Sequence, residues 1–110
     1  MRTLLLVVAM LASGLAHGGN CSIDLKADDA MKFDQQTVTV AASCKTITIN
    51  LTHTGKLPIQ TMGHNVVIAP TDVFQAIAQD GMKAGLAGNY VQAGDARVIA
   101  HTKVIGGGEK

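Results

Sequence analysis

The sequence has no excess of charge of either sign. The 110-residue chain contains nine Lys and Arg against eight Asp and Glu, and without Arg2 the balance is eight to eight. Nucleic acids and anionic membranes recruit basic surfaces, so neither is expected as a partner. The apolar runs are also short, since none reaches the ~20 residues of a membrane-spanning helix. The length supports one domain at most.

The motifs of common hydrolases are missing too. The chain has no Gly-x-Ser-x-Gly elbow, no free Cys beside a His and no catalytic pair of carboxylates. Asp28 and Asp29 are adjacent, but this pair is better explained as a turn. The sequence therefore does not predict an enzyme.

Cysteine is scarce, and its context is that of an exported protein. Residues 1–18 have the pattern of a secretory signal, with Arg2, an apolar core over 4–11 and small residues near Gly18. In an exported chain, Cys21 and Cys44 favour one disulfide over a metal pair or a redox motif. Such a bond would stabilise the fold by about 3 kcal/mol and would leave no thiolate for a metal.

Alternating apolar and polar residues predict several short strands. Cys21, Ile23 and Leu25 alternate with polar residues, and the clearest strand has Ile47, Ile49 and Leu51 on one face. Shorter strands are expected over 37–40 and 66–68, and a longer one over 97–105. Turn residues between them favour an antiparallel β-sandwich.

One helix is expected after Pro70, with Thr71 or Asp72 as its cap. Its apolar residues have helical spacing, and three glycines should weaken its last turns. They are Val73, Phe74, Ile77, Ala78, Met82 and Leu86, with Gly81, Gly85 and Gly88. This helix should lie as a flap on the outside of a sheet.

Three histidines of the mature region differ in context. His64 stands in Met62-Gly63-His64-Asn65, where Gly63 permits a close backbone approach and Asn65 could orient a ligand. His53 ends the strongest predicted strand, and a packed histidine is the simplest interpretation. His101 lies among charged residues and should be solvated.

Separated motifs after about Gly19 occur in an order and spacing that resembles the azurin family. They are residues 21–24, 31–33, 50–53, 55–58, 62–65, 80–82, 97–102 and 108–110. The resemblance implies a Greek-key cupredoxin β-sandwich with one helical flap and a periplasmic blue-copper protein that carries single electrons. It also implies small redox partners such as c-type cytochromes and periplasmic reductases.

The resemblance assigns site residues. His64 would be one copper ligand, the Gly63 carbonyl a weak axial contact, and Asn65 a support for the Cys-bearing loop; Cys21 and Cys44 would form the family's disulfide. Family members supply a Cys, a second His and a Met beyond the equivalent of Lys110. Residues 19–110 are therefore expected to form a partial cupredoxin domain that lacks these ligands.

Two further features bear on function. Met31, Leu57, Met62 and Met82 match a family patch where redox partners dock, although methionines also fill core gaps. Val66 departs from the family, where a buried Trp is common. The alternatives to electron transfer are a secreted, metal-free β-sandwich binding module and a copper-storage protein, which would group its Met and His residues more closely.

Overall fold

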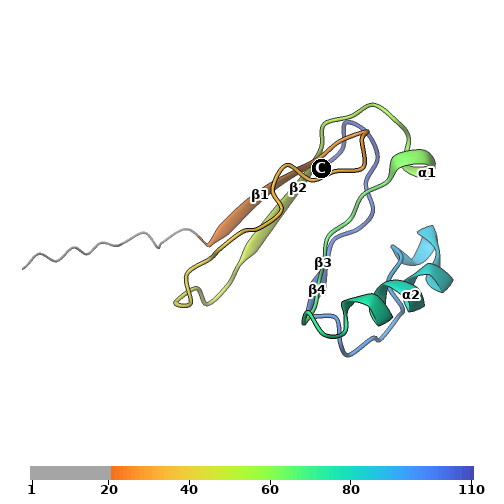
Figure 1. Cartoon of the computed structure of the whole chain (residues 1–110). Coiled ribbons are helices and arrows are strands. Elements are labelled where there is room, and N and C mark those ends of the chain that lie inside the picture. The colour runs from red at the N-terminus through yellow and green to blue at the C-terminus, as the bar shows by residue number, and fades with distance from the viewer. Residues whose placement is uncertain (1–20) are drawn as a thin grey trace, which may run out of the picture.

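The computed structural model describes residues 21–110, so the predicted signal peptide of residues 1–18 lies outside the described residues. The described chain forms two separate two-stranded sheets with short helices between their strands (Figure 1). In chain order the elements are β1 Ser22–Ala27, β2 Thr48–His53, α1 Ile59–Met62, β3 Val67–Ile68, α2 Phe74–Ala84, the 3-10 helix η2 Leu86–Gly88, and β4 Ala100–His101.

Strands β1 and β2 form a parallel pair in which the predicted apolar faces match. Ile23 lies opposite Ile49, and Leu25 lies opposite Leu51. Because side chains alternate between the faces of a strand, these residues share one face of the sheet. Burial increases along this face, from Ile47 just before β2, 45% exposed, to Leu51, 6% exposed. These two predicted strands are confirmed, but they pair in parallel, whereas the sequence favoured antiparallel strands.

A disulfide joins Cys21 to Cys44 across the start of this sheet, as predicted. The amide of Thr48 donates to the Cys21 carbonyl at 2.9 Å, so the cross-link lies directly beside the first strand pairing. Parallel strands need a long connection, and here residues 28–47 make it. The disulfide closes most of that connection.

The strand predicted over 37–40 is wrong, because these residues form no strand. Polar side chains just before this segment bind the outer edge of β1. Asp34 accepts from the Lys26 amide at 2.9 Å, and the Gln35 side chain donates to the Asp24 carbonyl at 2.8 Å. The β-branched residues of 37–40 therefore have no strand edge with which to form backbone hydrogen bonds. Residue type alone does not make a strand.

The strand predicted over 97–105 is mostly wrong in extent. Only Ala100–His101 forms β4, which pairs antiparallel with β3. The pairing continues irregularly, because the Val66 amide donates to the Thr102 hydroxyl at 2.9 Å instead of to a carbonyl. An isolated bridge then joins His64 to Ile105.

The helix α2 is confirmed, but its predicted cap is wrong. Val73 is the N-cap and no side chain caps the helix; the Val73 amide donates to the Pro70 carbonyl instead. The helix ends at Gly85, whose φ of +67° favours glycine, as the glycine-rich sequence predicts. In Figure 1, α2 lies on the side of β3 and β4 away from β1 and β2. The one-turn helix α1 was not expected.

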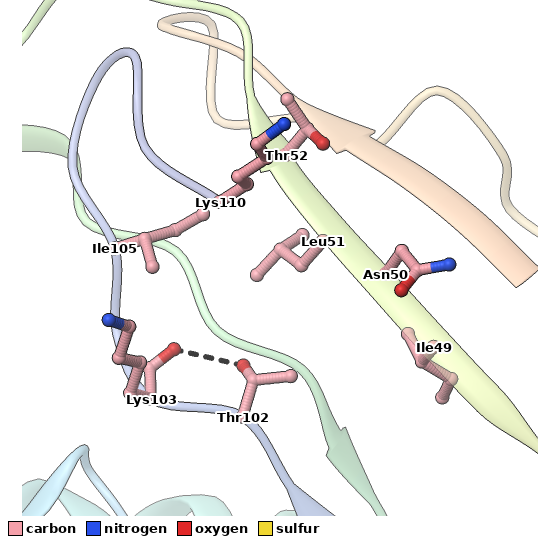
Figure 2. A pocket seen from close by; sticks show the side chains of 8 residues that line it. All are labelled: Ile49, Asn50, Leu51, Thr52, Thr102, Lys103, Ile105 and Lys110. Atoms are coloured by element: carbon pink, nitrogen blue, oxygen red, sulfur yellow. Dashed lines mark hydrogen bonds between the residues drawn. The ribbon is translucent and has the colours of Figure 1, made fainter.

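Apolar residues that should face a sandwich core are only partly covered. Ala27, Leu51 and Ile105 form a small buried cluster, with Leu25 and Val66 packed against it. A cavity of about 310 Å³ lies between β2 and residues 102–105. Figure 2 shows Leu51 and Ile105 on opposite sides of it. Residues 21–110 form a small β structure that is not a closed barrel, and none of their helices is long and apolar enough to cross a membrane.

Candidate metal centre

His64 is fixed by backbone pairing at the end of the structure that carries α1. Its amide donates to the Ile105 carbonyl at 3.0 Å, and the Ile105 amide donates to the His64 carbonyl at 2.8 Å. A Cβ on Gly63 would lie 2.7 Å from both the Ile59 carbonyl oxygen and a methyl of Val104. Glycine therefore precedes His64 because the chain passes too close to both residues for any side chain.

The imidazole of His64 is held in one tautomer. Its Nε2 lies 2.7 Å from the carbonyl oxygen of Asp28. A carbonyl can only accept, so Nε2 carries a proton, and in the neutral ring Nδ1 keeps its lone pair. The Asp28 carbonyl belongs to the predicted turn, where its own carboxylate accepts from the Ala30 and Lys32 amides. The turn thus fixes which ring nitrogen of His64 is turned to the protein and leaves Nδ1 as the candidate metal-binding atom.

His53 is the packed histidine that the sequence predicts. It is 1% exposed, and its ring centroid lies 4.8 Å from that of His64. Nε2 donates to the Met62 carbonyl at 2.7 Å, while Nδ1 accepts from the Gly55 amide at 3.0 Å. Both ring nitrogens are therefore engaged within the protein, and His53 has no lone pair for a metal.

Asp29 holds the loop that follows His53. Its carboxylate accepts from the amides of Lys56 at 2.7 Å and Leu57 at 3.2 Å. The amide of Lys56 is the largest cause that lowers the pKa of Asp29, opposed by partial burial and assisted by Leu57 and the two histidines. The ionised carboxylate also lies 3.9 Å from Nε2 of His53. The Asp29 carboxylate thus lies between the amides of the loop and the ring of His53.

A family model described as copper binding proteins, plastocyanin/azurin family, matches residues 19–110. The chain belongs to this family. Several azurins are similar to it over most of its length. The azurin of Bordetella pertussis is 51% identical over 104 residues, which cover 94% of this chain and 68% of that protein. The azurin of Alcaligenes faecalis is 55% identical over 89 residues, covering 81% and 70%. The azurin of Pseudomonas putida is 50% identical over 90 residues, covering 82% and 70%.

The described residues fit one part of the copper site expected for this family. A blue-copper centre takes two imidazoles and a thiolate, with a weak axial contact. The contact of His64 Nε2 with the Asp28 carbonyl leaves the other ring nitrogen, Nδ1, as the candidate ligand atom. Within residues 21–110, however, no group of three His, Cys, Asp or Glu could hold a metal, and both cysteines are in the disulfide. The described part of the chain thus offers one candidate imidazole and not a complete ligand set.

Asn65 has a partner that the sequence did not indicate. Its side-chain amide donates to the backbone carbonyl of Asn89 at 2.8 Å. The support of a Cys-bearing loop by Asn65 stays a prediction, as does the axial contact of the Gly63 carbonyl. His101 is exposed, as expected.

The four residues of the predicted docking patch differ in their exposure. Met31 and Met82 are 74% and 73% exposed, Leu57 is 38% exposed, and Met62 is half-buried at the end of α1. Met31 and Leu57 lie in the loops next to Asp29 and Lys56, whereas Met82 lies on α2. The two exposed methionines leave too much surface uncovered to be gap-filling core residues.

Sequence reasoning missed three groups around His64. They are the Asp28 carbonyl, the ring of Phe33 at 6.0 Å from the imidazole centroid, and Asn89. Phe33 lies within one of the family motifs, and its bridge to Ala27 places it near the site. The backbone carbonyl had no signal in residue type. A signal for Asn89 was its position directly after Gly88, since Asn favours the left-handed conformation that follows a helix end.

Proposed function

We propose that this protein carries single electrons at a blue-copper site to which His64 contributes one imidazole. The observation that carries the proposal is the contact between Nε2 of His64 and the Asp28 carbonyl at 2.7 Å, which leaves Nδ1 free. Family membership and the identity to azurins support copper as the metal. The metal-free binding module is not favoured by these findings.

Each residue of the centre has a separate task in this proposal. His64 would hold copper through Nδ1, and the Gly63 carbonyl would add a weak contact. Bound copper would supply the one-electron redox change. In this proposal His53 and Asp29 do not bind the metal; His53 fixes the Met62 carbonyl two residues before His64, and Asp29 fixes the loop at Lys56. The protein acts as an electron carrier rather than as an enzyme.

The proposed setting is the periplasm, and the proposed partners are small redox proteins such as c-type cytochromes and periplasmic reductases. Exposed Met31 and Leu57, together with half-buried Met62 at the end of α1, support the proposal of an apolar docking patch. Weak electron-transfer encounters need only a small contact of this kind. Met82 belongs to the same proposal, although it lies on α2.

The proposed complete fold is a Greek-key cupredoxin sandwich. The cavity beside Leu51 and Ile105 supports this, because further strands of such a sandwich would cover an apolar face there. The amide of His53 already donates to the Glu109 carbonyl at 2.9 Å, which brings residues 108–110 alongside the end of β2 (Figure 1).

The test has two arms. The first is the nucleotide sequence after the codon for Lys110, where a frame that encodes a Cys, a His and a Met would complete the ligand set. The second is spectroscopic. With Cu(II), residues 19–110 alone should give an ordinary type-2 paramagnetic spectrum and no intense thiolate-to-copper band in the red. The same residues joined to an azurin-like C-terminal segment should turn blue.

In the extended protein, His64→Gly should remove or strongly perturb the blue band. The matched control is His101→Gly, which alters an exposed histidine outside the centre and should leave the band in place. A blue His64→Gly variant with an unchanged spectrum would refute the assignment of His64. A blue band from residues 19–110 alone would mean that Cys21 or Cys44 binds copper.

A further inference from the structure

The strand pairing that carries His64 contains a β-bulge. Thr102 pairs with Val66, and Ile105 pairs with His64. Between these pairs, the segment that follows β4 has two residues, Lys103 and Val104. The segment that precedes β3 has only Asn65. Two residues opposite one define a bulge, which leaves an amide without its ladder partner and is common beside functional sites.

Asn89 satisfies both sides of this bulge. Its side-chain Oδ1 accepts from the amide of Val104 at 2.8 Å. Its backbone carbonyl accepts from the side-chain amide of Asn65 at 2.8 Å. Val104 is 7% exposed, so its amide would lose a hydrogen bond that water could not easily replace. One residue from another segment therefore clamps the two strands directly beside His64.

The local conformation of Asn89 makes this clamp possible. Its φ of 57° is left-handed, and its own amide donates to the Leu86 carbonyl at 2.9 Å, which closes the short helix η2. Asn and Asp adopt this conformation more readily than other residues with side chains. The helical segment after α2 thus ends on the one residue that reaches the bulge from both its main chain and its side chain.

We propose that Asn89 is a positioning residue for the metal centre, acting through the bulge to fix the backbone and ring orientation of His64. The chain of contacts runs from the Asn89 side chain to the amide of Val104, then through Ile105 to both backbone groups of His64. A second path runs through Asn65, the residue that follows His64. This inference rests on the proposed role of His64 as a ligand.

The sharpest variants are Asn89→Gly and Asn89→Asp. Glycine keeps the left-handed backbone and the carbonyl that binds Asn65, but it removes the acceptor for Val104. Aspartate keeps an acceptor oxygen at the same place and tolerates the same backbone conformation. Gln92→Ala, at an exposed position of the same loop, is the matched control.

The first measurements need no copper. In the 110-residue chain, hydrogen exchange should show the Val104 amide protected. Asn89→Gly should speed that exchange by about fivefold, the effect of one ordinary hydrogen bond. Nitrogen NMR of the His64 ring should show protonated Nε2 in the unaltered chain and a mixture of tautomers in Asn89→Gly. Asn89→Asp and Gln92→Ala should match the unaltered chain in both measurements.

The second measurement is the affinity for Cu(II). Asn89→Gly should lower it by about tenfold, as lost support of a metal ligand usually does, and Asn89→Asp should restore it. An unprotected Val104 amide, an unchanged His64 tautomer in Asn89→Gly, or equal damage by Asn89→Asp would each overturn the inference. If His64→Gly does not alter copper binding, the proposed function fails instead, and the copper-free measurements still decide the role of Asn89.

Discussion

Replacing both cysteines, Cys21→Ser with Cys44→Ser, should remove stability without disturbing the metal centre. The disulfide closes a loop with a sequence separation of 23 residues. The chain-entropy model assigns a loop of this length about 3 kcal/mol. Small domains are only marginally stable, so for a domain with this small a core about 3 kcal/mol is a large share of the whole free energy of unfolding.

The location of the bond makes the prediction specific. The disulfide lies before β1, whereas Asp28, which orients His64, follows the other end of this six-residue strand. Six residues of strand separate the two ends by roughly 20 Å. Removing the disulfide should therefore lower the free energy of unfolding and leave the tautomer of His64 unchanged.

Urea unfolding followed by circular dichroism is the assay. For a domain of this size the loss corresponds to a fall of roughly 2 M in the midpoint. The ring nitrogens of His64 serve as the internal control. A midpoint shift under about 0.5 M would contradict the entropic argument. A changed His64 tautomer in the still-folded variant would show that the two ends of the sheet are coupled.

Three further outcomes are expected. Gly63→Ala should destabilise the fold by about 1–3 kcal/mol in thermal unfolding, because the new Cβ would lie 2.7 Å from Ile59 and Val104; an undamaged variant would contradict this packing. The pKa of Asp29 is lowered from 3.8, so the stability it contributes is present above that pH and is lost as pH falls through its folded value; the substitution Asp29→Asn should remove this acid-labile part from the pH dependence of unfolding. Arg97→Gln removes the hydrogen bonds to Asp80 and Asp95 that join α2 to the following loop. Amide hydrogen exchange should therefore become faster over residues 74–84 and stay unchanged in β1.

Elements that depend on local pattern were predicted well. The alternation in β1 and β2 is long enough to fix both the strands and their inner face, and the glycines after Ala84 end α2 as expected. The cysteine pair and the buried His53 also followed from residue type and context. In each case the prediction depends on a few neighbouring residues, or, for the disulfide, on two cysteines that have no other cysteine to pair with.

Elements that depend on distant partners were predicted poorly. Residues 37–40 have strand-forming side chains, but Asp34 and Gln35 bind the edge that they would need. Residues 102–105 alternate like a strand, yet the bulge at Lys103 and Val104 interrupts the ladder. Alternation cannot reveal such an interruption, because an extra residue in one strand is visible only against its partner.

The same distinction applies to the metal centre. The copper-site roles of His64 and Gly63 are predictions from the family resemblance, whereas the groups that orient the imidazole come from far along the chain. The Asp28 carbonyl is 36 residues away, and Asn89 is 24 residues from Asn65. Three segments therefore converge on one histidine: the Asp28 carbonyl binds the ring, Ile105 pairs with the backbone, and Asn89, in our proposal, holds the bulge that keeps both contacts in place. In the proposed copper site, a histidine held in this way before the metal binds would need little rearrangement when copper gains or loses an electron, which is what rapid electron transfer requires of its site.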